Sequence, residues 1–371
     1  MLTRHFCILD VAISLSGPPA IVTPIATAYG RFAVERRPAD AIELIVESQS
    51  SAQVDGRSVR LLDELDPTLQ VYQHFLNAVY DHLDSHVLLH AAALGDGAGG
   101  AFLLAAPGGH GKTSLTLELV QRGRRFLSDD FAPLDPLDGR IHPYPRTVGV
   151  LPVGGAPIPA AFRKAAEDPA VVKLLGKSLL DVGRVAGEQA LAREPLPLRT
   201  VILLSGSAEA IAPVRSQLEV ACRREAAETI ETRLTAIPGV TIADRRETRD
   251  LRVWRIDLEH ARGPTAALSR VLDHDGVLFS QKLWDAPPDF SAEPAAVPLR
   301  RREAAELLAR EILNRRPSGR LLARYDGKLA RLFVDLAAAL RPARCWLVTA
   351  GRYAPTADLI EALVDGKRAG T

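Results

Sequence analysis

The pattern of hydrophobic and polar positions divides the chain into two parts. In the first part, short apolar runs mixed with polar residues predict strands at 6–13, 31–34 and 41–46. The sequence Val54-Asp55-Gly56-Arg57 is typical of a two-residue hairpin turn. A helix is then predicted from apolar residues at helical spacing, which are Tyr72, Phe75, Leu76, Val79, Tyr80 and Leu83. We therefore expect residues 1–85 to form a β-rich N-terminal domain closed by a helix.

In the second part, residues 86–371, short apolar runs alternate with longer helical patterns. Strands are predicted at 101–105, 125–128, 201–204, 252–258 and 345–348. Helices are predicted at 113–121, within 155–195, at 218–234, at 300–314 and from 355 onward. The predicted fold class is thus α/β (α+β), with a single domain over 86–371 that carries an insertion at about 206–295. Three smaller features complete this prediction: Lys173 and Lys177 on one helix face, a helix end at Asp273-His274-Asp275, and a linker or surface loop at 286–298.

The run Ala106-Pro107-Gly108-Gly109-His110-Gly111-Lys112-Thr113 lies between a predicted strand and a predicted helix. Its last three residues match the phosphate-binding pattern G-x-x-x-x-G-K-[ST], although Ala106 replaces the first glycine. Backbone N–H groups at such a helix N-terminus favour anions. Lys112 would reach the β- and γ-phosphates of ATP, and Thr113 would ligate Mg²⁺. The predicted nucleotide-binding residues are Pro107, Gly108, Gly109, His110, Gly111, Lys112, Thr113 and Ser114. Among them His110 is either a phosphate contact or a solvated loop side chain, and the second interpretation is favoured.

Two adjacent carboxylates, Asp129 and Asp130, follow the strand predicted at 125–128. Neighbouring residues of an extended strand point to opposite faces. At the end of a strand, one carboxylate can therefore face a nucleotide-bound metal while the other faces a phosphate acceptor. Phosphoryl transfer requires positioning, charge neutralisation and a carboxylate that takes the proton of the nucleophile. The pair indicates a site for phosphoryl transfer.

Residues 86–135 resemble the HPr kinase/phosphorylase family and the related HPr-kinase-like serine kinases. The resemblance rests on the segments Leu88-Leu89-His90-Ala91-Ala92-Ala93, the phosphate loop, Leu119-Val120-Gln121-Arg122-Gly123 and Ser128-Asp129-Asp130. As in the family, the second aspartate follows the loop lysine by eighteen residues. The resemblance implies that Asp130 is the general base for a serine hydroxyl and that Asp129 supports the metal. It also implies an active-site role for His90, which would otherwise be interpreted as a core histidine, and a P-loop core of the HPr kinase and phosphoenolpyruvate-carboxykinase-like type.

The chain also departs from that family. The Glu-Ile-Arg-Gly-Leu-Gly signature of the bifunctional members does not occur in the sequence. In the corresponding region lies Pro143-Tyr144-Pro145-Arg146-Thr147, which resembles the proline–arginine turn of the looser relatives. Arg146 is accordingly a candidate phosphate or substrate contact, and a surface arginine in a proline-rich turn is the alternative. Without the signature, phosphorylase activity and HPr itself as the acceptor are unsupported.

Composition sets further limits on function. The net charge of the 371 residues is +1, which argues against a general nucleic-acid or membrane-surface binder. No apolar run is long enough to span a membrane. The three cysteines, Cys7, Cys222 and Cys345, are far apart, as expected of a reduced, cytoplasmic protein.

The function predicted from the sequence is an ATP-dependent, Mg²⁺-dependent kinase of a serine hydroxyl on a protein or peptide. A kinase of a small-molecule hydroxyl, or a carboxykinase-like phosphoryl transfer, is the alternative that the sequence does not separate from it. A non-catalytic nucleotide-binding regulator is a third interpretation, against which Asp130 argues. The sequence leaves open whether the chain forms a homo-oligomer.

Overall fold

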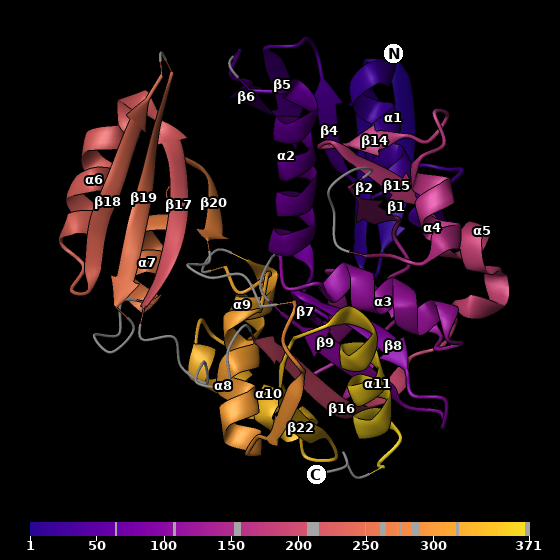
Figure 1. Cartoon of the computed structure of the whole chain (residues 1–371). Coiled ribbons are helices and arrows are strands. Elements are labelled where there is room, and N and C mark those ends of the chain that lie inside the picture. The colour runs from indigo at the N-terminus through magenta and orange to yellow at the C-terminus, as the bar shows by residue number, and fades with distance from the viewer. Residues whose placement is uncertain are drawn as a thin grey trace.

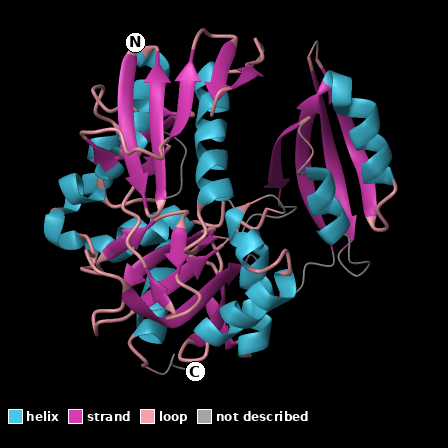
Figure 2. Ribbon diagram, turned by 180° about the vertical axis from the view of Figure 1, so that it is seen from behind, coloured by secondary structure: helices cyan, strands magenta, loops and turns pink. Residues whose placement is uncertain are grey.

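The computed structural model describes residues 1–63, 65–106, 109–151, 157–205, 215–248, 250–259, 265–272, 274, 276–283, 290–316 and 319–367. These residues form a mixed α/β structure with several sheets, as Figures 1 and 2 show. Among the described helices, none combines the length and the apolar character that crossing a membrane requires.

The N-terminal residues form a six-stranded sheet in the order β3-β1-β2-β4-β5-β6. Two helices, α1 and α2, pack on it and share a hydrophobic core with it. The pairing is antiparallel except between β2 and β4, which run parallel. The elements are β1 (Leu2–Ile8), β2 (Val11–Gly17), α1 (Pro19–Ala28), β3 (Ala33–Val34), β4 (Ile42–Val46), β5 (Ser51–Val54), β6 (Arg57–Arg60) and α2 (Pro67–His82).

Much of this N-terminal secondary structure agrees with the sequence pattern. The hairpin turn between β5 and β6 places Asp55 and Gly56 in the left-handed region, with φ of 49° and 77°. Helix α2 buries the predicted apolar face. The single strand predicted over 6–13 is wrong, because the chain reverses there between β1 and β2. Leu9, at a φ of 55°, lies in that turn, and the apolar pattern runs through the reversal without a break.

The central sheet of nine strands has the main order β10-β8-β9-β16-β12-β11-β7, and β22 also pairs with β16 and β21. Strand β16 lies between β9 and β22 and runs parallel to both. The strands are β7 (Val87–Leu89), β8 (Ala91–Gly95), β9 (Ala101–Ala105), β10 (Phe126–Ser128), β11 (Ala132–Leu134), β12 (Arg140–Ile141), β16 (Leu196–Ser205), β21 (Ala295–Pro298) and β22 (Arg344–Thr349). Strand β22 pairs with β16 of this sheet, and the helix after it packs on the sheet.

Helices cover both faces of the central sheet (Figure 1). Phe102 and Leu104 of β9 pack with helices α3 (Lys112–Gln121) and α11 (Tyr353–Val364). The alternate residue Leu103 packs with the helices of the other face, which are α8 (Arg301–Arg310), α9 (Arg320–Arg324) and α10 (Leu329–Ala339). This alternation follows from the two-residue period of a strand. It fixes α3, and therefore the loop before it, at the edge where β9 ends.

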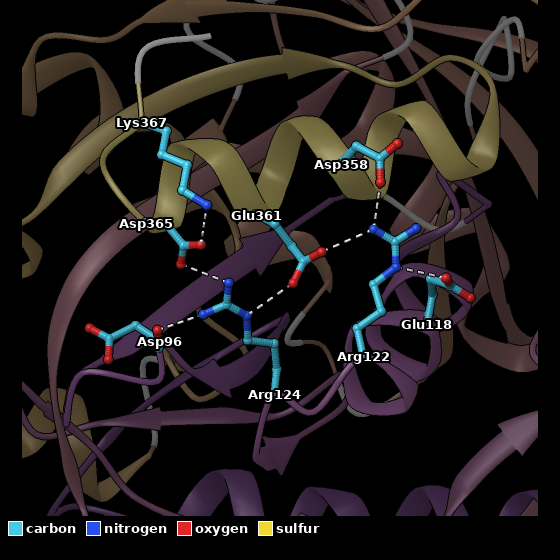
Figure 3. Close-up of polar contacts among 8 residues, drawn as sticks. All are labelled: Asp96, Glu118, Arg122, Arg124, Asp358, Glu361, Asp365 and Lys367. Atoms are coloured by element: carbon cyan, nitrogen blue, oxygen red, sulfur yellow. Dashed lines mark hydrogen bonds and ion pairs between the residues drawn. The ribbon is translucent and has the colours of Figure 1, made fainter.

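Two arginines connect α11 to α3 and the turn after it (Figure 3). Arg122 Nη1 lies 3.0 Å from one carboxylate oxygen of Glu361, and Arg124 Nε lies 3.3 Å from the other. Arg124 also donates a hydrogen bond of 2.6 Å to the backbone carbonyl of Asp96. The other acidic partners are Glu118, Asp358 and Asp365. A shared carboxylate that binds two largely buried guanidinium groups holds the C-terminal helix against the P-loop helix.

Residues 155–195 differ from the helical prediction. They contain the helices α4 (Ala160–Ala166) and α5 (Val182–Ala186), and between them the strands β14 (Lys173–Leu174) and β15 (Lys177–Leu180). Strand β15 pairs with β14 on one side and with β13 (Val148–Val150) on the other. Lys173 and Lys177 therefore do not share a helix face. Leu175 and Gly176 form the turn with φ of 54° and 74°, which is typical of a tight hairpin.

A separate four-stranded sheet, β18-β19-β17-β20, carries two helices packed on it (Figure 1). The helix predicted at 218–234 is wrong in its first half, which is strand β17. In β17 the alternate residues Leu218, Val220 and Cys222 are buried, so the two-residue period overrides the helical pattern there. The elements are β17 (Arg215–Arg223), α6 (Ala227–Thr235), β18 (Val240–Glu247), β19 (Leu251–Glu259), α7 (Thr265–Leu272) and β20 (Val277–Leu283).

Three other local predictions differ from the structure or fall outside it. Helix α7 ends at Leu272, while Asp273 and Asp275 lie outside the described residues. The predicted loop at 286–298 is described only from residue 290, and its end forms β21, which pairs with β22. Helix α8 ends at Arg310, four residues earlier than predicted.

Candidate active site

The phosphate loop leads from strand β9 into helix α3. Gly109 and Gly111 both have positive φ, 81° and 77°, and Gly111 is the N-cap of the helix. Such backbone conformations favour glycine because it lacks a Cβ atom. Pro107 and Gly108 lie outside the described residues. Lys112 is the first residue of α3. The free backbone N–H groups at this end of the helix attract an anion, and the lysine side chain starts from the same place.

Lys112 lies at the centre of the candidate site. Its side chain is buried, with 5% exposure, and its Nζ atom lies 3.0 Å from Oδ1 of Asp130. The same Nζ lies 2.9 Å from Nε2 of His90 and 3.5 Å from the carbonyl oxygen of Ala106. Three side chains proposed from the sequence thus meet at one point, although they come from β7–β8, α3 and β10–β11.

Asp130 occupies the turn between β10 and β11 at a φ of 63°. Aspartate tolerates this left-handed region better than most residues. Burial alone would raise the pKa of Asp130, but Lys112, Arg146 and His90 together hold it below its usual value. The carboxylate is therefore ionised at neutral pH, and its side chain remains 30% exposed. An ionised and partly accessible carboxylate can accept a proton from a bound hydroxyl.

Unlike that of Asp130, the side chain of Asp129 is buried and contacts Thr113. The hydroxyl of Thr113 donates a hydrogen bond of 3.0 Å to its Oδ2, while Oδ1 is buried without a hydrogen-bond partner. Burial, together with the neighbouring charge of Asp130, raises the pKa of Asp129 to about 7. A buried carboxylate with an unpartnered oxygen beside a hydroxyl is an oxygen donor set of the kind that Mg²⁺ prefers. Thr113 and Asp129 thus fit the predicted metal role.

His90 is fixed by a residue that the sequence did not indicate, Glu311. The His90 Nδ1 atom lies 3.1 Å from Oε2 of Glu311, and the two backbones are joined by a hydrogen bond of 2.8 Å. If Nδ1 carries the proton and donates it to Glu311, Nε2 is left as the acceptor for the Lys112 ammonium group. Glu311 follows α8 and lies 221 residues from His90, so no local pattern could have predicted the contact.

Arg146 is not a surface side chain. It is 12% exposed, and its Nη2 lies 3.3 Å from Oδ2 of Asp130. Its Nη1 donates a hydrogen bond of 2.8 Å to the hydroxyl of Tyr72, and its guanidinium lies 4.3 Å above the ring of Phe131. Tyr72 belongs to α2, so the N-terminal part of the chain contributes to the site. The sequence indicated Tyr72 only as a core residue of the helix.

Two further loop residues were proposed as nucleotide contacts, His110 and Ser114. His110 is 2% exposed, so the interpretation as a solvated loop histidine is wrong. Ser114 is buried, and its carbonyl accepts a hydrogen bond of 2.7 Å from the hydroxyl of Tyr353.

A cavity of about 290 Å³ lies beside the N-terminus of α3. Its lining includes Gly111, Ser114, Phe290, Gly351 and Tyr353. Phe290 lies 3.5 Å from the position that a Cβ atom at Gly111 would take. A largely apolar cavity of this size next to a phosphate loop can accommodate a nucleotide base, and neither aromatic residue was indicated by the sequence.

Comparison with known proteins gives a coarse result, which comes from solved structures. No family model matches the sequence. No curated protein matches it either. Among solved structures, the chain is similar to the HPr(Ser) kinase/phosphatase from Coxiella burnetii, with 18% sequence identity and a TM-score of 0.23. The match covers 35% of this chain and 75% of that one. The chain therefore has a distant and partial structural resemblance to that enzyme.

Proposed function

We propose that this protein is an ATP-dependent kinase that transfers the γ-phosphate to a serine hydroxyl of a protein or peptide. The observation that carries the proposal is the division of labour between the two adjacent carboxylates. Asp129 is buried and bonded to Thr113, whereas Asp130 is ionised, partly exposed and paired with Lys112. A P-loop kinase needs this separation between a metal-side carboxylate and a base.

In this proposal the N-terminus of α3 and Lys112 bind the phosphates of ATP. Mg²⁺, held by Thr113 and Asp129, would neutralise phosphate charge. The proton of the acceptor hydroxyl passes to Asp130, the acceptor oxygen forms a bond to the γ-phosphorus, and the bond to the β-bridging oxygen breaks to release ADP. Arg146, which contacts Asp130, would stabilise the negative charge of the phosphoryl group during transfer. This function implies that residues 86–371 form a P-loop core of the HPr-kinase type.

The choice of acceptor rests on the sequence resemblance and on the accessibility of Asp130. Its side chain is 30% exposed, whereas the metal-side Asp129 is 1% exposed. The cavity beside Gly111 and Ser114 is lined by residues of α3, by α11 and the segment that precedes it, and by Phe290, and we assign it to the adenine base. The acceptor would then approach Asp130 from solvent, which suits a peptide segment.

The test is a transfer assay with γ-³²P-labelled ATP, Mg²⁺ and a serine-containing peptide library, with free serine and alanine-substituted peptides in parallel. We expect label in the serine peptides only, and its loss in Asp130→Asn protein that still binds ATP by calorimetry. Transfer to free serine alone would replace the peptide acceptor by a small molecule. Binding of ATP without transfer to any acceptor in this set would contradict the kinase proposal.

A further inference from the structure

A second cluster of possible ligands lies at the opposite ends of the strands that carry the candidate active site. His86 precedes β7, Asp135 follows β11, and His142 follows β12. In the antiparallel register, Val87 pairs with Leu134, so His86 and Asp135 extend the same pairing by one position. Directly paired residues project to the same face of a sheet.

The third residue, His142, lies on the same face of the sheet, as its pairing with β11 shows. The backbone N–H of His142 donates to the carbonyl of Pro133, which places His142 opposite Pro133. Because Pro133 and Asp135 are two positions apart on one strand, they share a face. Three adjacent strands therefore present two imidazoles and one carboxylate to a single point.

The side chains meet as the register requires. One potential ligand atom from each of His86, Asp135 and His142 lies within 4.8 Å of the other two. The two histidine rings are 4.1 Å apart between centroids. Ligand atoms around a tetrahedral zinc ion are separated by about 3.3 Å, so a small closure of side-chain torsions would bring the three atoms to bonding distance.

His86 supplies the observation that points to a ligand. Its side chain is buried, with 8% exposure, and its Nε2 atom has no hydrogen-bond partner. Its Nδ1 atom lies 2.6 Å from the hydroxyl oxygen of Ser85, a contact that orients the ring. In the tautomer whose Nδ1–H donates to Ser85, the lone pair of Nε2 is free for a metal ion. A buried, unpartnered nitrogen carries a desolvation cost that a metal ion at this position would remove.

The electrostatic surroundings favour a cation. Burial lowers the pKa of His86, whereas the negative charges of Asp135, Asp10 and Asp138 act to raise it. The same three carboxylates would stabilise a cation bound beside His86.

We propose that His86, Asp135 and His142 bind a divalent transition-metal ion, with Zn²⁺ the expected occupant. Two imidazole nitrogens and one carboxylate oxygen suit Zn²⁺ and its neighbours in the first transition row, whereas Mg²⁺ prefers oxygen ligands alone. The site is therefore chemically distinct from the oxygen donors Thr113 and Asp129 at the phosphate loop. Three protein ligands leave one coordination position for water or for a fourth ligand.

Such an ion would cross-link strands β7, β11 and β12 at one end. At the other end of β7 lies His90, about 13 Å from His86 at the rise of an extended strand. At the other end of β11 lies Asp130. Binding of the metal would restrain the two strands that position His90 and Asp130, without contact with the nucleotide.

The test measures metal binding by itself and does not depend on kinase activity. Full-length protein is freed of metal with a chelator and titrated with Zn²⁺ against a chromophoric competitor. We expect one equivalent per chain, and an affinity at least about 10-fold lower in Asp135→Asn and in His142→Gln. Titration with Co²⁺ alone should give visible absorption bands that both variants lose.

Two control variants address the alternatives. His5→Gln removes a histidine of β1 that is bonded to Ser14, and Asp129→Asn alters the proposed Mg²⁺ site. Both should keep the stoichiometry and the Co²⁺ spectrum of the wild type, and Zn²⁺ should raise the melting temperature of the wild type but not of Asp135→Asn. Wild-type protein that binds no Zn²⁺ or Co²⁺ at this stoichiometry overturns the proposal, whatever the variants do. Undiminished binding in folded Asp135→Asn and His142→Gln would also overturn it.

Discussion

The Nζ atom of Lys112 lies 3.0 Å from Oδ1 of Asp130. The residue proposed to bind phosphate is thus paired with the residue proposed to act as the base. The phosphates of ATP would compete with Asp130 for the lysine. Because Lys112 and Arg146 hold the pKa of Asp130 low, drawing Lys112 toward phosphate would make the carboxylate more basic when the nucleotide is bound. In the proposed mechanism, this contact would couple nucleotide binding to activation of the base.

This coupling predicts two opposite effects of Asp130→Asn. The change removes the competitor for Lys112 and a negative charge near the γ-phosphate, so ATP should bind with equal or higher affinity. The amide cannot take a proton, so the transfer rate should fall by about 10²–10⁴-fold. Calorimetry for ATP and single-turnover transfer measure the two effects separately. A marked loss of ATP affinity in folded Asp130→Asn would show that the carboxylate supports nucleotide binding instead of opposing it.

Asp129→Asn should act on the metal requirement. Asp129 has a buried, unpartnered Oδ1 atom and a pKa near 7, so Mg²⁺ would compensate a charge that the protein itself leaves poorly stabilised. We expect the Mg²⁺ concentration for half-maximal activity to rise at least about 10-fold, the size of effect that loss of a metal-site interaction typically has. Thr113→Val, which removes the neighbouring hydroxyl with little change of shape, should act in the same direction. An unchanged Mg²⁺ dependence in both variants would place the metal elsewhere.

The sequence predicted elements whose signals are local. The two-residue turn at Asp55 and Gly56 and the strand–loop–helix around Lys112 depend on neighbours in the chain, and both occur in the structure. The turn at Leu9 and the strand β17 were missed because apolar residues ran through the reversal in one case and mimicked a helical pattern in the other.

The residues that contact the candidate site from distant parts of the chain could not be predicted from the sequence, for a different reason. Glu311 beside His90 and Tyr72 beside Arg146 are brought to the site from 221 and 74 residues away. Glu311 follows a helix and Tyr72 lies on an apolar helix face, and no neighbouring residue in the sequence indicates that either contacts the site. The candidate catalytic residues could thus be proposed from motifs and resemblance, but the residues that orient them could not.

The hydrogen bond from Arg146 to Tyr72 predicts that α2 positions the site. Tyr72→Phe removes the hydroxyl but keeps the ring, so Arg146 loses one acceptor while Asp130 and Phe131 remain in place. A hydrogen bond to a charged group contributes about 1.5–3 kcal/mol, and only part of it bears on positioning, so we expect kcat to fall by about 3–10-fold. Tyr80→Phe, on the same helix but stacked with Arg316, is the matched control and should leave kcat unchanged. Equal losses in both variants would indicate a general effect on α2.

The ion pair between Arg31 and Asp181 predicts a pH-dependent contribution to stability. Arg31 Nη2 lies 2.7 Å from Asp181 Oδ1, and the aspartate side chain is 19% exposed. Burial alone would raise the pKa of Asp181, but the hydrogen bond from Arg31 and the backbone N–H of Arg184 hold it below its usual value. A carboxylate with a lowered folded-state pKa stabilises the fold above its unfolded pKa and loses that contribution as the pH falls through the folded one. Asp181→Asn should therefore destabilise the protein by about 1–2 kcal/mol at pH 7.

The difference between wild type and Asp181→Asn should shrink as the pH is lowered below about 4, because the carboxyl group of the unfolded chain becomes protonated there while that of the folded protein is still ionised. Urea unfolding at pH 7, 5 and 3.5 would measure it, provided that both proteins are folded at the lowest pH. Arg37→Gln is the matched control, because Arg37 and Glu43 form a more exposed pair, with side-chain exposures of 48% and 39%. Exposed pairs contribute about 0–1 kcal/mol, so this variant should change stability little at any pH. A constant difference for Asp181→Asn across the range would mean that its carboxylate stabilises the fold through packing and not through its charge.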